Sequence, residues 1–142
     1  KGYRAWSREL TPDVTPYEAG LSFAVSLDKA GGFIGREALV AAKASGTPSK
    51  RIVQFTVDDP LPMLWGGELI LRDGKPVGEA RSAAYGHTLG RAVALGLVEN
   101  AAGVDKAFLE NGRFEVDLAG ERFALTVHLA PAYDPKAARV KA

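Results

Sequence analysis

The chain has 142 residues, of which 46% are hydrophobic and 25% are charged. This balance is close to the globular average, so it excludes a disordered chain and a coiled coil. The 18 basic and 17 acidic residues are interspersed, which argues against a nucleic-acid binder, and the lack of cysteine excludes a disulfide scaffold and an iron–sulfur site.

No segment has the properties of a membrane span or a secretion signal. The longest uncharged apolar stretch is far shorter than the roughly 20 residues that a transmembrane helix needs. The first residues, Lys-Gly-Tyr-Arg, contain no apolar signal segment. We therefore expect a protein without membrane contact in a reducing compartment, the cytoplasm. Because the chain begins without methionine, we also expect a fragment or a processed piece of a longer protein.

The first 47 residues predict two short helices and one strand. Residues 15–18 (Thr-Pro-Tyr-Glu) have a capping threonine, a proline in the first turn and a glutamate three positions after the cap, which is typical of a helix start. Alternating apolar residues predict a strand over 22–27. Residues 35–44 predict a second helix that Gly46 ends, and residues 45–50 have the composition of a boundary between two units.

From residue 51 onward the hydrophobic period changes to two, which indicates strands. Asp73-Gly74, Asn111-Gly112 and Ala119-Gly120 predict tight hairpin turns between them. Six or seven short strands separated by such turns favour a small closed or nearly closed antiparallel barrel. The predicted strands cover 51–57, 68–72, a segment after Pro76, 91–98, 114–118 and 122–129.

Few residues have a pattern that predicts catalysis. His87 and His128 are the only histidines, and neither has a partner at metal-ligand spacing, so no metal site is predicted. The chain contains no Gly-x-Ser-x-Gly motif, and residues 86–90 lack the ending of a phosphate-binding loop. The adjacent carboxylates Asp58 and Asp59 precede two prolines, which favours a surface loop. We therefore predict no catalytic residue.

The two ends of the chain carry better candidates for ligand contact. Tyr3, Arg4 and Trp6 lie at the beginning, and Tyr133 and Arg139 lie near the end. Aromatic side chains stack on planar heteroaromatic ligands, and an arginine suits an acidic tail. The alternative is that the large aromatic side chains cover a core, which is their commoner role.

Three motifs follow one another along the chain, and the resemblance they carry extends over nearly its whole length in the correct order. Residues 1–21 contain Glu-Leu-Thr and Thr-Pro-x-Glu-Ala-Gly-Leu, residues 33–39 are Phe-Ile-Gly-Arg-Glu-Ala-Leu, and residues 77–90 contain a glycine-rich signature that an apolar strand follows. Together these residues resemble the aminomethyltransferase family, to which the glycine-cleavage T-protein belongs. The residues of the first motif are most similar to the folate-dependent C-terminal half of dimethylglycine and sarcosine dehydrogenases.

The resemblance implies an α+β fold, mainly β with some α. Residues 1–47 would be the tail of a folate-binding α+β domain, and residues 48–142 would be a six-stranded antiparallel β-barrel. The parent enzyme would transfer a one-carbon (aminomethyl) unit from an amine derived from glycine, sarcosine or dimethylglycine to tetrahydrofolate. A dehydrogenase parent would also carry FAD in a missing N-terminal domain.

The resemblance further implies which partners and residues matter. The partners would be tetrahydrofolate, a methylated amine or aminomethyl carrier, and the missing N-terminal domains of the same chain. The family's catalytic residues would precede Lys1, so the isolated chain is expected to be inactive. The implied folate contacts are Tyr3 and Trp6 near the pterin ring, and Arg139 near the glutamate tail.

The sequence is also compatible with two other functions. The first is a non-catalytic binding barrel of the translation-factor or oligonucleotide type, although the balanced charge argues against it. The second is a structural domain that packs against a catalytic partner.

Overall fold

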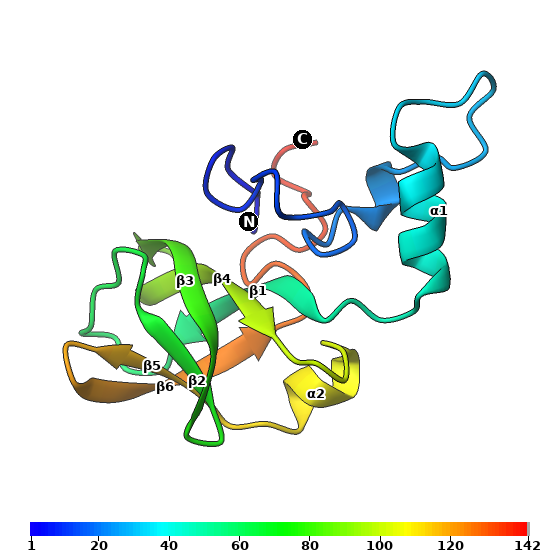
Figure 1. Cartoon of the computed structure of the whole chain (residues 1–142). Helices are drawn as coiled ribbons and strands as arrows, with labels where there is room; N and C mark the ends of the chain where they lie inside the picture. Colours follow the sequence, from blue (N-terminus) through cyan, green and yellow to red (C-terminus); the bar gives the residue numbers. More distant parts are fainter. Residues whose placement is uncertain (142) are drawn as a thin grey trace.

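Six antiparallel strands close into one barrel in the order β1-β4-β3-β2-β5-β6 (Figure 1). The computed structural model describes residues 1–141. The predicted six-stranded antiparallel barrel and the mainly β fold class are therefore confirmed. The strands are β1 (Lys50–Val57), β2 (Leu69–Arg72), β3 (Lys75–Gly86), β4 (Arg91–Glu99), β5 (Phe114–Leu118) and β6 (Glu121–His128).

Alternation along β1 separates the inside of the barrel from its outer face. Val53, Phe55 and Val57 belong to the interior core, where the rings of Phe55 and Phe114 lie 5.5 Å apart. Ile52 points the other way and forms a smaller buried cluster with two β4 residues, Leu95 and Leu97. This second cluster explains why β4 is buried on both faces, as its apolar sequence predicts.

Two of the three predicted hairpin turns are present. Asp73-Gly74 and Ala119-Gly120 both have positive φ at their two central residues, as the favoured two-residue hairpin turns require. The prediction for Asn111-Gly112 was wrong, because these residues follow a short helix, α2 (Lys106–Glu110). Asp105 caps this helix by accepting a hydrogen bond from the Phe108 amide at 2.7 Å.

The N-terminal segment departs further from the sequence predictions. The helix-start signal at 15–18 forms its reciprocal side-chain bonds, since the Glu18 carboxylate accepts from the Thr15 amide at 2.7 Å, but only a turn follows. The strand predicted at 22–27 was wrong. Residues Ser22–Ala24 form a short 3-10 helix (η1), and Phe23 is 85% exposed because no strand lies beside it.

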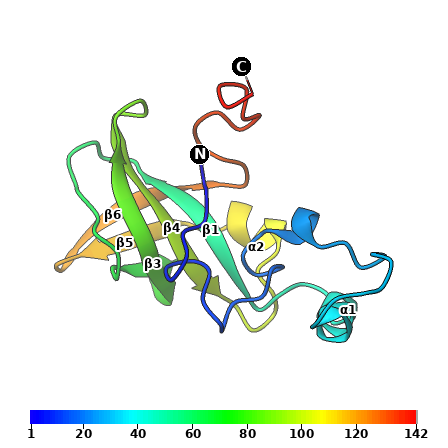
Figure 2. The same cartoon turned by 90° about the horizontal axis from the view of Figure 1, so that it is seen from above.

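The second predicted helix is confirmed as α1 (Arg36–Ala44), with Gly46 just beyond its end. No residue of α1 is buried, and the helix stands away from the barrel in both views (Figures 1 and 2). Among residues 1–47 only Glu9 and Ala19 are buried. The first 47 residues therefore have almost no core of their own.

Segment 1–21 nevertheless lies on the outer face of the barrel. The Ile52 amide of β1 donates to the Glu18 carbonyl at 2.8 Å, and the Ser82 hydroxyl of β3 donates to the Glu9 carboxylate. The C-terminal tail crosses nearby, where the Ala132 amide donates to the Gln54 side chain at 2.9 Å. Both ends of the chain thus meet beside β1 (Figure 1).

Candidate functional site

A pocket of about 510 Å³ lies where three parts of the chain meet. The N-terminal segment supplies one wall, the beginning of β1 and the end of β6 supply the second, and the tail after β6 supplies the third. The second wall is continuous because Gln54 and His128 are direct partners in the β1–β6 ladder. Apolar side chains make up much of the lining: Leu10, Leu21, Phe23, Ile52, Leu109 and Leu129.

The charged side chains of the pocket are mostly cationic. Lys1, Arg4 and Arg51 line it together with one carboxylate, Asp134. Lys1 forms an ion pair with Asp134, so each of these two charges is already balanced. The Lys1 hydrogen bond holds the pKa of Asp134 below its usual range and raises the pKa of Lys1. Two arginines therefore remain as an excess of positive charge.

Arg4 is held in place by backbone carbonyls. Its side chain donates to the Ala19 carbonyl at 2.9 Å and to the carbonyl of Gly2. Burial lowers the pKa of Arg4, and the negative charge of Glu9 acts in the opposite direction. Because each protonated guanidinium keeps its charge at neutral pH, Arg4 presents a fixed positive group at the pocket.

Glu9 is the carboxylate behind this arrangement. Its side chain is fully buried. A carboxylate is rarely buried unless its oxygens accept hydrogen bonds. One of its oxygens accepts from the Ser82 hydroxyl, and the other accepts from the Ala5 amide at 2.8 Å. Glu9 thereby ties the turn that follows Arg4 to β3 of the barrel.

His128 contributes a polar group to the β6 side of the pocket. Its Nε2 lies 2.9 Å from the Thr56 hydroxyl, which fixes the plane of the ring. Partial burial lowers the pKa of His128, and the nearby charge of Asp58 opposes this shift. The imidazole is therefore neutral at pH 7 and can offer one N–H or one lone pair, but no positive charge.

The three predicted folate-contacting residues are not brought together in this pocket. Tyr3 lines it and is 67% exposed. Trp6 is 84% exposed and lines a neighbouring hollow of about 330 Å³, which shares Leu10 and Leu21 with the pocket. Arg139 lies outside the lining, with its guanidinium carbon 5.9 Å from the centre of the Tyr133 ring. Their contact with folate stays a prediction.

Sequence reasoning missed several residues that line the pocket. Arg4 belongs to the end of the chain that carries candidates for ligand contact, but it is not among the implied folate contacts. Arg51 and His128 belong to strands whose patterns give no sign of a ligand. Asp134 follows the aromatic Tyr133 directly. A search for charged residues near both chain ends could have found Lys1 and Asp134. Arg51 has no such signal, because only the barrel brings it to the N-terminal segment.

Within residues 1–141, no group of three or more histidine, aspartate or glutamate side chains is placed to hold a metal ion. None of the helices in this part of the chain is both long and apolar enough to cross a membrane.

Comparison with protein families decides the identity of the barrel. Residues 50–134 match the model of the glycine cleavage T-protein C-terminal barrel domain. The chain belongs to this family. The match begins at the first residue of β1 and ends just after the last strand of the barrel, in the tail that lines the pocket.

Individual T-protein barrel relatives extend the similarity over the N-terminal segment. The chain is 39% identical to mouse mitochondrial sarcosine dehydrogenase over 143 aligned residues, which is 99% of this chain and 15% of that protein. It is 36% identical to the aminomethyltransferase of Shouchella clausii, covering 90% of this chain and 33% of that protein. The crystal structure of aminomethyltransferase T from Bartonella henselae superimposes with a TM-score of 0.75 and 28% identity, covering 92% of this chain and 35% of the other.

Proposed function

We propose that this chain is the C-terminal part of a tetrahydrofolate-dependent one-carbon transferase, and that its pocket holds part of the folate. One observation carries the proposal: the pocket combines apolar walls with an excess of cationic groups. Folate is a long, largely aromatic molecule that ends in carboxylates, so both kinds of lining suit it. The relatives named aminomethyltransferase and sarcosine dehydrogenase support the choice of reaction.

In this proposal the residues of the chain bind and orient folate. Tyr3 lies on the pocket wall and offers a ring for stacking. Trp6 extends this aromatic surface into the neighbouring hollow, and Arg139 approaches the acidic tail from outside the wall. Folate supplies the acceptor for the one-carbon unit. The catalytic residues would belong to a preceding part of the protein, so the isolated chain would bind folate without turning it over.

The domain division also becomes a proposal. Residues 1–47 would be the end of a folate-binding domain, and residues 48–142 would contain the barrel. The near absence of a core in residues 1–47 supports this division, because only Glu9 and Ala19 are buried there and no residue of α1 is. The missing domains of the same chain would then be the partner that covers α1.

The amine donor and FAD also belong to the proposed whole protein. The chain spans 15% of mouse sarcosine dehydrogenase and 33% of the Shouchella aminomethyltransferase. An N-methylated amine or an aminomethyl carrier would enter through a part of the protein outside this segment. FAD would be needed only where the parent is a dehydrogenase, and it would lie in a preceding domain.

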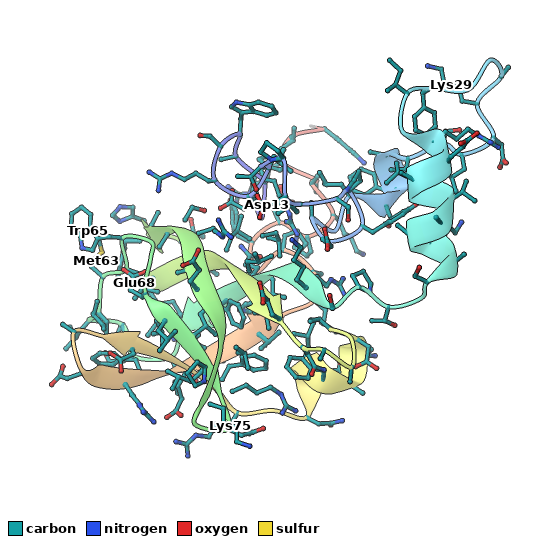
Figure 3. All side chains as sticks on the ribbon, in the orientation of Figure 1. Asp13, Lys29, Met63, Trp65, Glu68 and Lys75 are labelled. Carbon is teal, nitrogen blue, oxygen red and sulfur yellow. The ribbon has the colours of Figure 1, made fainter. Side chains whose placement is uncertain are left out.

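A fluorescence titration with 5-formyltetrahydrofolate tests the proposal. The chain has two tryptophans, Trp6 and Trp65. Trp65 lies at the outer edge of the barrel on the side away from α1 (Figure 3), so a Trp65→Phe background leaves Trp6 as the reporter. We expect saturable quenching of Trp6. Replacement of Arg139 by alanine should weaken binding about tenfold, since it removes one charge-assisted contact.

The control is Arg122→Ala, which removes an exposed arginine of β6 that does not line the pocket. Its affinity should equal that of the parent. If folate does not bind at millimolar concentration, the chain alone has no folate site, and the proposed pocket function is wrong for this segment. If folate binds equally to the Arg139 variant, Arg139 is a structural residue.

A further inference from the structure

Arg51 differs from the other cationic groups of the pocket in having no partner. Lys1 has Asp134, and Arg4 has two backbone carbonyls. Within residues 1–141, no acceptor lies within hydrogen-bonding or ion-pairing distance of the Arg51 guanidinium. The residue is only half exposed, because it lies at the beginning of β1 beneath the N-terminal segment. The guanidinium nitrogens of Arg51 keep access to solvent. The group can therefore take an acceptor that enters the pocket.

The two arginines of the pocket are close enough to affect one another. Burial lowers the pKa of Arg4 most, and the positive charge of Arg51 lowers it further. The negative charge of Glu9 acts on Arg4 in the opposite direction and more strongly than Arg51 does. The positive charge that faces the pocket without a carboxylate beside it is therefore mainly that of Arg51.

We infer that Arg51, with Arg4 beside it, binds a carboxylate of the ligand that occupies this pocket. The inference rests on the proposed function and adds to it the residue that recognises the acidic end of folate. An incoming carboxylate would give the guanidinium of Arg51 its missing acceptor and would reduce the repulsion between the two arginines. Guanidinium groups suit this role because two parallel N–H groups match the two oxygens of a carboxylate.

Arg51 is better placed than Arg139 to meet a carboxylate inside the pocket, whereas Arg139 would meet the acidic tail outside the wall. Arg139 lies outside the pocket lining, and its side chain is directed to the face of the Tyr133 ring. Its amide is also held by the Asp134 carboxylate at 3.2 Å. Arg51 lies on a strand of the barrel, so its position depends on the β-ladder and less on the tail. A rigid strand is a more precise support for a binding group than a chain terminus.

The test compares two ligands that differ only in charge. The first is 5-formyltetrahydrofolate, and the second is the same compound with both glutamate carboxyls converted to amides. Binding of each is measured by Trp6 quenching in the Trp65→Phe chain, in an Arg51→Gln variant and in the Arg122→Gln control. Arg51→Lys is included because it keeps the charge and loses the planar fork, and circular dichroism verifies that each variant is folded.

We expect the acid to bind at least about tenfold more tightly than the diamide in the parent and in the Arg122 control. In Arg51→Gln this preference should fall about tenfold, with little change in the affinity for the diamide, and any preference that remains would come from Arg139. Arg51→Lys should retain part of the preference. A general packing defect would weaken the binding of both ligands equally. The ratio of the two affinities therefore separates recognition of charge from damage to the fold.

Two results would overturn the inference while leaving the proposed function intact. One is equal binding of acid and diamide by the parent, and the other is an unchanged preference in Arg51→Gln. If neither folate compound binds, the proposed function fails and the inference is decided with anilinonaphthalene sulfonate against its uncharged parent phenylnaphthylamine. If the parent prefers the sulfonate and Arg51→Gln abolishes this preference, Arg51 binds anions in a pocket that does not bind folate. If the parent shows no such preference, or Arg51→Gln keeps it, the role of Arg51 is refuted.

Discussion

Glu9 stabilises the fold through the hydrogen bonds that its buried carboxylate accepts. A glutamate is ordinarily found at the surface, yet Glu9 is fully buried between the N-terminal turn and β3. Sequence reasoning placed it in a family motif and assigned it no role. The structure explains its burial, because its two oxygens satisfy a hydroxyl and an amide that would otherwise be unpaired.

Replacement of Glu9 by alanine should therefore destabilise the fold. The change leaves Ser82 and the Ala5 amide without their acceptor and creates a cavity, so we expect a loss of about 2–4 kcal/mol in the free energy of unfolding. Urea denaturation followed by circular dichroism measures this loss. Glu110→Ala, which removes an exposed glutamate paired only with Lys106, should cost about 0.5 kcal/mol or less. Equal effects of the two changes would show that the buried carboxylate is not a structural anchor.

At the level of helices and strands, the local sequence patterns predicted the correct element where neighbouring strands pair with the segment. Period-two patterns and the Asp73-Gly74 turn located β1 and the β2–β3 hairpin, because each strand has a partner on both sides of the barrel. The same pattern at 22–27 failed, since no strand pairs with that segment. The Asn111-Gly112 signal failed because the cap at Asp105 starts a helix just before it.

Two glycines, Gly78 and Gly96, lie where strands approach closely, and replacing each by alanine tests this packing. A Cβ added at Gly78 would lie 1.9 Å from the Leu97 carbonyl, and one added at Gly96 would lie 2.3 Å from the end of the Ile70 side chain. We expect Gly96→Ala to cost about 1–3 kcal/mol of unfolding free energy, and Gly78→Ala to cost more because a backbone carbonyl cannot rotate away.

Ile70→Val provides the matched control, because it removes the methyl group that the new Cβ at position 96 would meet. In the Ile70→Val background the cost of Gly96→Ala should decrease, whereas the cost of Gly78→Ala should remain the same. Thermal or urea unfolding of the four glycine variants, beside the parent and Ile70→Val, measures both differences. Equal costs at the two glycines in either background would contradict the packing argument.

At the scale of the whole molecule, the pocket depends on contact between the two ends of the chain. Lys1 and Asp134 are far apart in the sequence and form an ion pair at the pocket wall. The Asp134 carboxylate also accepts from the amides of Ala138 and Arg139, so one aspartate organises both the wall and the tail. Because these bonds favour the charged carboxylate, its pKa is lower in the folded state than in the unfolded chain.

The tail should therefore detach in acid. A carboxyl with a lowered folded pKa contributes stability above the ordinary value of about 3.9, and this contribution is lost as the pH falls through the folded value. We expect the amide resonances of Ala138 and Arg139 to shift together below about pH 4. In Asp134→Asn this transition should disappear. A transition that persists in the variant would mean that another group controls the tail.

The order of residues was enough to predict the mainly β fold, the strand-forming region after residue 48, the helix at α1, two of the three hairpin turns and the family. These features depend on spacing between near neighbours, which the order of residues displays directly. Which groups share the pocket follows from how the barrel and the two chain ends fold together. Arg51, His128 and Lys1 meet there because the barrel closes β6 against β1 and the chain ends cross the same face. Such contacts join residues far apart in the chain, and no local pattern specifies them.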